Sequence, residues 1–139
     1  MNINFVAVLV GAVINMVLGF LWYGPLFGKS WQKLSGLTDA KLNEMKKKGM
    51  TNVYLFSMLG ALLMAFVLVM TINLTGSVGI MEGVKLGFWI WLGFVAPTML
   101  NSVLYEDKSW NLYWINTGYY LVALMIMGGV LASWMVTPL

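Results

Sequence analysis

The sequence contains no cysteine, no histidine and no arginine. Disulfide bonds, thiol nucleophiles, imidazole bases and the usual zinc ligands are therefore excluded. Charged residues are also scarce, at 9% of the 139 residues, whereas hydrophobic residues make up 60%. An ordinary soluble domain has about 25% charged residues. So few charges cannot cover this much apolar surface, and the composition predicts an integral membrane protein rather than a soluble, disordered or nucleic-acid-binding chain.

Four stretches are long and apolar enough to cross a bilayer, which takes about 20 residues of helix. They are residues 3–23, 53–74, 84–105 and 112–136. The remaining segments are too short to form a soluble domain. The sequence therefore predicts one all-α transmembrane domain over residues 1–139, built as a bundle of four transmembrane helices.

Loop 1, residues 25–52, is more than a linker. Pro25 fixes its φ angle and lacks an N–H, so it is expected to end the first helix. Thr38 and Gly49 have the chemistry of an N-cap and a C-terminal stop, which predicts a short interfacial or cytoplasmic helix over residues 39–48. Six of the eight cationic side chains lie in this loop: Lys29, Lys33, Lys41, Lys46, Lys47 and Lys48. The last three are candidate contacts for lipid headgroups, although the positive-inside bias alone also accounts for them.

The distribution of lysine also predicts an orientation. Loop 1 and loop 3, residues 106–111, share one side of the membrane and hold seven of the eight lysines. Because Lys-rich loops face the cytoplasm, we expect loops 1 and 3 inside and both termini outside, in the plasma or inner membrane of a cell.

Polar side chains inside a bilayer are costly, and they usually face the bundle interior or a cavity. In this sequence they gather in the half of the spans next to loops 1 and 3. This distribution predicts a cytoplasm-facing polar pocket among the helices. Asparagine also serves as an interhelical hydrogen-bonding group in membranes, so a packing role stays open. The candidate ligand-binding residues are Asn15, Trp22, Tyr23, Asn101, Asn116 and Tyr120.

Small residues indicate where helices approach closely. Gly11, Asn15 and Gly19 repeat every four residues and share one helix face, across which the asparagine is expected to hydrogen-bond. The motif Gly83-x3-Gly87 is expected to pack between protomers of a homo-oligomer. Pro97 is expected to kink the third helix, because it removes one backbone hydrogen bond.

Two segments resemble a known family. LWYGPLFGKSW (residues 21–31) resembles the segment after the first helix in the domain-of-unknown-function 1761 family of small four-helix integral membrane proteins. INTGYYL (residues 115–121) resembles the start of that family's last helix. The resemblance extends over essentially the whole chain. It implies a bacterial or fungal membrane protein of this architecture, and it assigns no activity and no catalytic residue.

The sequence holds no P-loop, GxSxG or GxGxxG motif and no cluster of metal ligands. We therefore expect a non-enzymatic protein without a cofactor or metal. Two functions stay open. One is binding or permeation of a small ligand, ion or lipid through the polar pocket, by a homo-oligomer embedded in the lipid bilayer. The other is a non-catalytic accessory or assembly subunit, whose partner is a larger membrane protein. Nucleic acid is not an expected partner.

Overall fold

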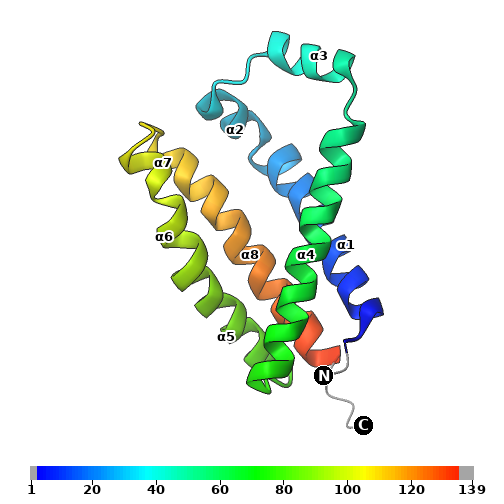
Figure 1. Ribbon diagram of the computed structural model, residues 1–139. Coiled ribbons are helices and arrows are strands. Elements are labelled where there is room, and N and C mark those ends of the chain that lie inside the picture. The colour runs from blue at the N-terminus through cyan, green and yellow to red at the C-terminus, as the bar shows by residue number, and fades with distance from the viewer. Residues whose placement is uncertain (1–2, 135–139) are drawn as a thin grey trace.

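The computed structural model describes residues 3–134, and this part of the chain is helical without any strand (Figure 1). Four helical rods, Phe5–Leu26, Thr51–Thr75, Ile80–Leu104 and Trp110–Trp134, are long and apolar enough to cross a membrane. The predicted all-α bundle of four such helices is thus confirmed. The elements are α1 (Phe5–Leu21), the π-helical segment η1 (Trp22–Leu26), α2 (Gly28–Ser35), α3 (Asp39–Lys48), α4 (Thr51–Thr75), α5 (Ile80–Ile90), the π-helical segment η2 (Trp91–Val95), α6 (Ala96–Met99), α7 (Asn101–Leu104) and α8 (Trp110–Trp134).

The ends of the rods differ from the ends of the predicted spans by up to four residues. The largest difference is at the start of the third rod. That helix begins at Ile80, directly after Gly79, whose φ of 94° marks the turn. Its first turns hold Glu82 and Lys85, which form an exposed ion pair at 3.3 Å. The predicted span leaves out residues 80–83, which include the charged Glu82. Residues 135 and 136 of the predicted fourth span lie outside the described residues.

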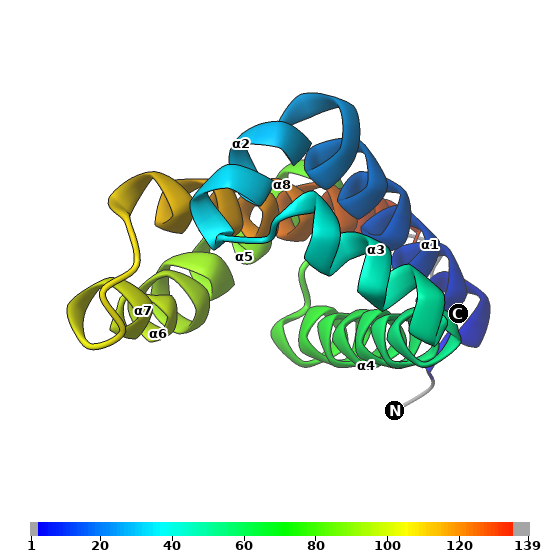
Figure 2. The same ribbon diagram turned by 90° about the horizontal axis from the view of Figure 1, so that it is seen from above.

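Helix α8 lies at the centre of the packing. Helices α1, α4 and α5 all contact it, and α1 also contacts α4 (Figures 1 and 2). In an 18-residue apolar stretch of α8, 50% is buried inside the bundle. In the corresponding stretch of the rod formed by α5 to α7, 17% is buried. The last helix in the chain is therefore the one against which the other three assemble.

Glycines bring α5 and α8 into backbone contact. A Cβ atom at Gly83 would lie 1.9 Å from the carbonyl oxygen of Gly128, and one at Gly87 would lie 2.3 Å from that of Leu124. The motif Gly83-x3-Gly87 therefore packs within one protomer, and the expectation that it packs between protomers is wrong. The physical reason is that α8 of the same chain offers a matching small-residue face.

The apolar core lies where α1, α4 and α8 meet. It is built from small and branched side chains, including Ala7, Ala12, Ala65, Val69, Ile72, Ala123, Met127 and Leu131. At the other end of α4, every residue from 51 to 60 is exposed. Helix α4 thus packs tightly along its second half and stands away from its neighbours along its first half, near α2 and α3 (Figure 1).

The apolar rods contain two prolines, and each is associated with a π-helical turn: Pro25 lies inside one, and Pro97 follows one. Pro25 lies inside η1, so the expectation that it ends the first helix is wrong. The backbone N–H of Phe27 bonds to the carbonyl of Trp22 at 2.8 Å, and this wider turn accommodates a ring that would clash in an α-helix. Pro97 lies at the start of α6, directly after η2. The α-helix of the third rod is thus interrupted by η2 just before Pro97, the residue at which the sequence predicts a kink.

The end of the molecule near α2 and α3 carries most of the charge. Thr38 caps α3 by accepting a bond from the Lys41 backbone N–H at 3.2 Å, and α3 ends at Gly49, as predicted. Loop 3 lies at this same end, whereas the first turn of α1 and the last turn of α8 lie at the opposite end (Figure 1). Seven of the eight lysines are therefore gathered at one end of the bundle.

Candidate functional site

Asn15 is buried, with 7% of its surface exposed, although it lies in the middle of α1. Its backbone carbonyl accepts a hydrogen bond of 2.8 Å from the Tyr119 hydroxyl, and its side-chain oxygen accepts from the same hydroxyl. Its side-chain Nδ2 donates to the sulfur of Met64 at 3.3 Å. One side chain of α1 is thereby tied to both α8 and α4, as the spacing of Gly11, Asn15 and Gly19 predicts.

Two more residues at the end of the first rod bond to α8. The indole N–H of Trp22 donates to the carbonyl of Ile115 at 2.9 Å. The Tyr23 hydroxyl donates to the side-chain oxygen of Asn116 at 2.8 Å. Both donors belong to η1, so the π-helical turn sets the direction in which the two side chains leave the first rod. Among residues 3–134, every buried side-chain nitrogen and oxygen has a partner.

Aromatic rings fill the space between these bonds. The ring centroid of Tyr119 lies 5.4 Å from that of Tyr23, 5.0 Å from that of Tyr120 and 6.5 Å from that of Trp22. Tyr23 also stacks edge-on against Trp31 of α2 at 5.5 Å. Tilted and edge-on pairs of this kind are favourable and rigid, so the polar groups are held in a fixed arrangement.

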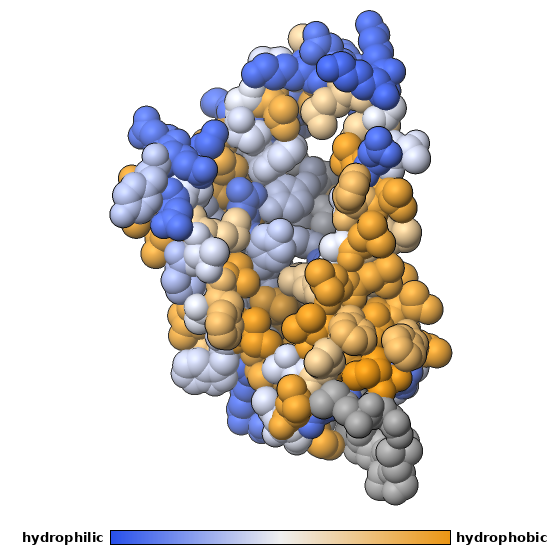
Figure 3. Space-filling view, viewed as in Figure 1, coloured by the Kyte–Doolittle hydropathy of each residue, from blue (hydrophilic) through white to orange (hydrophobic). Residues whose placement is uncertain are grey.

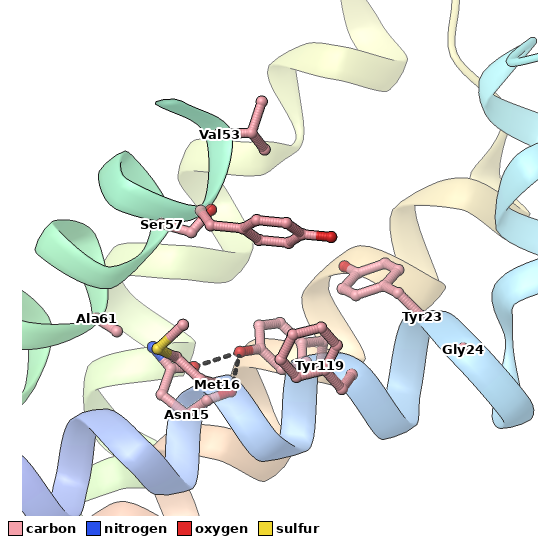
Figure 4. Close-up of a pocket in the computed structure, with 11 residues that line it drawn as sticks. Asn15, Met16, Tyr23, Gly24, Val53, Ser57, Ala61 and Tyr119 are labelled. Carbon is pink, nitrogen blue, oxygen red and sulfur yellow. Dashed lines mark hydrogen bonds between the residues drawn. The ribbon is translucent and has the colours of Figure 1, made fainter. Parts of the chain in front are cut away.

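A cavity of about 350 Å³ opens beside this cluster, between α1, α4 and α8. Figure 4 shows Val53 and Ser57 of α4 facing Tyr23 across the cavity, with Tyr119 and Asn15 at its inner end. We call it the tyrosine pocket. Its lining residues are Asn15, Met16, Gly19, Phe20, Tyr23, Gly24, Val53, Tyr54, Ser57, Ala61 and Tyr119.

The tyrosine pocket exists because α4 diverges from its neighbours. On α1, Gly19 adds no side chain to the space, and a Cβ atom there would lie 3.4 Å from the Tyr119 hydroxyl. On α4, Val53, Tyr54 and Ser57 are exposed because no helix covers them. The hollow is visible in the upper half of Figure 3, where paler side chains lie beside an apolar column on the right.

The lining of the pocket is mostly apolar, and its polar groups are uncharged. Its described lining contains phenol, hydroxyl and amide groups but no Lys, Asp or Glu. Within residues 3–134, no three acidic side chains come together as a metal site would require. Chemically, such a lining suits a neutral molecule that forms hydrogen bonds better than an ion, because a buried ion would lack a counter-charge.

The structure brings most of the predicted site residues together. Asn15 and Tyr23 line the pocket, and Trp22, Asn116 and Tyr120 form the layer behind it through the contacts given above. Asn101 is exposed on α7 and does not line the pocket. The lysines predicted to contact lipid headgroups, Lys46 to Lys48, are exposed on the last turn of α3.

Sequence reasoning missed Tyr119, which makes the central contacts. It also missed Trp91, whose indole N–H donates to the carbonyl of Thr117 at 2.8 Å. Trp22 and Trp91 each begin a π-helical turn and bond to α8 carbonyls two residues apart. A signal was present in the sequence, since Trp-x-Gly occurs at both residues 22–24 and residues 91–93.

Comparison with known proteins gives a family. The profile of the family described as "Protein of unknown function (DUF1761)" matches residues 6–132, which is nearly the whole chain. No curated protein and no solved structure matches the chain. The matched region contains every residue of the tyrosine pocket and nearly all of the four apolar rods, whose outer limits are Phe5 and Trp134. The protein therefore belongs to the DUF1761 family, whose function is unknown.

Proposed function

We propose that this protein is a non-enzymatic membrane protein that binds a small neutral ligand in the tyrosine pocket. The observation that carries the proposal is a cavity of about 350 Å³ with fixed tyrosines at its inner end and apolar side chains around them. Ligand sites usually combine a mostly apolar lining with a few well-placed polar groups, and their volumes begin at about 300 Å³.

The hydrogen bonds of the pocket restrict the ligand. A phenol has one proton to donate, and the protons of Tyr23 and Tyr119 are both donated to asparagine oxygens. Each phenol oxygen can still accept a bond. At these two tyrosines, a ligand group that donates, such as an alcohol or an amide N–H, therefore fits better than one that only accepts.

The positive-inside rule supports a cytoplasmic position for the end that carries α2, α3 and loop 3. In that orientation the tyrosine pocket faces the cytoplasmic half of the bilayer, and the termini lie outside. Lys46 to Lys48 would then lie beside anionic headgroups. The small-residue contact between α5 and α8 closes the opposite half, which favours binding over free permeation.

Photolabelling tests this proposal. The purified protein in detergent micelles is irradiated with a six-carbon alcohol that carries a diazirine, and labelled residues are mapped by mass spectrometry. We expect saturable labelling of Tyr23, Tyr54 and neighbouring pocket residues. Asn15→Leu should reduce it, because this change releases Tyr119, whereas the exposed Asn101→Leu is the matched control.

A second variant keeps this test decisive if Asn15→Leu fails to fold. Ser57→Leu fills the pocket from an exposed face of α4, where an apolar side chain is compatible with a membrane. We expect it to abolish pocket labelling. Labelling that is spread over all exposed apolar residues, or that is equal in wild type and Ser57→Leu, would disprove ligand binding in this pocket.

The alternative function is an accessory or assembly subunit of a larger membrane complex. The low burial of the rod formed by α5 to α7 favours this role, because the exposed surface of that rod is available to a partner helix. Native mass spectrometry after gentle extraction distinguishes the two. A larger protein at fixed stoichiometry supports the accessory role, and a monomer or homo-oligomer that retains a small adduct supports ligand binding.

A further inference from the structure

A second cavity of about 330 Å³ lies between α4 and the third rod, over α8. We call it the apolar groove. Its lining residues are Met64, Val67, Leu68, Thr71, Ile90, Phe94, Val95 and Leu124. Only Thr71 carries a polar side-chain group, and its hydroxyl already donates to the carbonyl of Val67 at 2.8 Å. The apolar groove thus offers a ligand a hydrocarbon surface.

The two cavities follow one face of α4. Ser57 and Ala61 line the tyrosine pocket, and Met64, Leu68 and Thr71 line the apolar groove. Steps of three or four residues keep these side chains on the same side of the helix. At 1.5 Å per residue, this stripe is about 21 Å long. A compartment that contains several polar groups is therefore followed along the helix by one that contains almost none.

Met64 separates the two compartments. Its side chain lines the apolar groove, while its sulfur accepts the bond from Asn15, which lines the tyrosine pocket. Methionine is unbranched and flexible, and a thioether is a weak acceptor. The arrangement is compatible with a connection between the two cavities, through rotation of this one side chain and loss of its bond with Asn15.

We infer that the ligand is a neutral single-chain lipid. Its hydroxyl-bearing head lies among the tyrosines, and its hydrocarbon chain passes Met64 into the apolar groove. This inference rests on the proposed binding function and specifies its substrate class. A single chain matches one narrow groove, and the uncharged lining of the tyrosine pocket disfavours phosphate headgroups.

The position of the chain, rather than its affinity, is the property to measure. Lipid tails are as apolar as the groove, so a longer chain gains little free energy by moving from bilayer to protein. The probe is hexadecanol with a diazirine near the middle of its chain. We expect its tail to label Leu68 and Phe94, with competition by excess hexadecanol but not by hexadecane.

Paired variants locate the tail. Val67→Trp fills the apolar groove from an exposed position, and Leu63→Trp places the same side chain at another exposed position on α4. We expect Val67→Trp to reduce groove labelling by the hexadecanol probe at least about fivefold and to leave labelling by the six-carbon probe unchanged. Leu63→Trp should change neither.

The outcomes separate this inference from the proposed function. If the six-carbon alcohol labels the tyrosine pocket while the hexadecanol tail labels outward residues such as Val6 and Val13, the lipid assignment is wrong and small-ligand binding stands. If neither probe labels its cavity, both are wrong. Equal competition by a diacyl phospholipid would disprove the neutral single-chain headgroup.

Discussion

The hydroxyl of Tyr119 on α8 donates to both oxygens of Asn15 on α1, 104 positions earlier in the chain. This contact fixes the first rod against the last at the inner end of the tyrosine pocket. It also orients the asparagine so that its Nδ2 reaches Met64 of α4. A single phenol therefore links the first rod to the last, and through Asn15 it is also connected to α4.

Replacing Tyr119 with phenylalanine should destabilise the protein by about 1–2 kcal/mol, because a buried amide oxygen then loses its donor. Equilibrium unfolding in mixed micelles, followed by circular dichroism, measures the change. Tyr105→Phe is the control, since Tyr105 is 83% exposed. Equal stability of the two variants would show that the bond to Asn15 contributes nothing.

Gly83→Ala should destabilise the protein by about 3 kcal/mol, because the new Cβ atom would meet the carbonyl of Gly128 and separate α5 from α8. Gly60 offers a matched control, since a Cβ atom there meets nothing within 4 Å. Gly60→Ala should be neutral or stabilising by up to about 1 kcal/mol, as expected for alanine in a helix. The same unfolding assay distinguishes the two changes, and a Gly83→Ala protein of wild-type stability would contradict the close contact.

Trp91→Phe should cost about 1 kcal/mol, because the carbonyl of Thr117 loses an indole donor at 2.8 Å. Trp89→Phe should cost less, since Trp89 is 63% exposed and lies on the outer surface. Hydrogen exchange provides a local measurement. Amides of η2 should exchange faster in Trp91→Phe alone, and uniform exchange in both variants would argue against an anchoring role.

The predicted orientation can be measured cleanly because the chain has no cysteine. In Lys47→Cys and Val78→Cys, each new thiol is the only one and occupies an exposed position. A membrane-impermeant maleimide should label Val78→Cys in intact cells and Lys47→Cys only in inverted membrane vesicles. The reverse pattern would place the tyrosine pocket in the outer half of the bilayer.

Lys46, Lys47 and Lys48 should enrich anionic lipid around the protein, at about 1 kcal/mol for each charge near the surface. Replacing all three with glutamine should lower the share of phosphatidylglycerol that co-purifies from vesicles of phosphatidylcholine and phosphatidylglycerol. Lys85→Gln changes a lysine at the opposite end and is the control. If the triple variant retains the wild-type lipid composition, α3 acts only in membrane orientation.

Local chemistry made part of this structure predictable. The span lengths, the cap at Thr38 and the end of α3 at Gly49 follow from short-range rules on hydropathy and backbone hydrogen bonds. The inward position of Asn15 followed from its spacing with Gly11 and Gly19. In each case the sequence signal lies within a few residues, as for the caps and the Gly11, Asn15 and Gly19 spacing, or it is the hydropathy that suits a bilayer, as for the spans.

The rest depended on contacts distant in sequence. Tyr120 was selected because it lies four residues after Asn116, but the adjacent Tyr119 makes the central bonds. Helix α8 contacts all three other rods and has apolar residues on every side, so its sequence does not identify the face toward α1. Pro25 was expected to end a helix, because the sequence does not show that a π-helical turn accommodates its ring. The partner of Gly83 was likewise another part of the same chain.

The central position of α8 has a consequence for the biogenesis of the protein. The ribosome makes this helix after the other three rods, yet it supplies the carbonyls for Trp22 and Trp91 and the hydroxyl for Asn15. During synthesis the first three rods therefore enter the bilayer before their polar groups have native partners. Insertion of α8 is the step that satisfies them together, so the packing of the first three rods is completed only after α8 has been made.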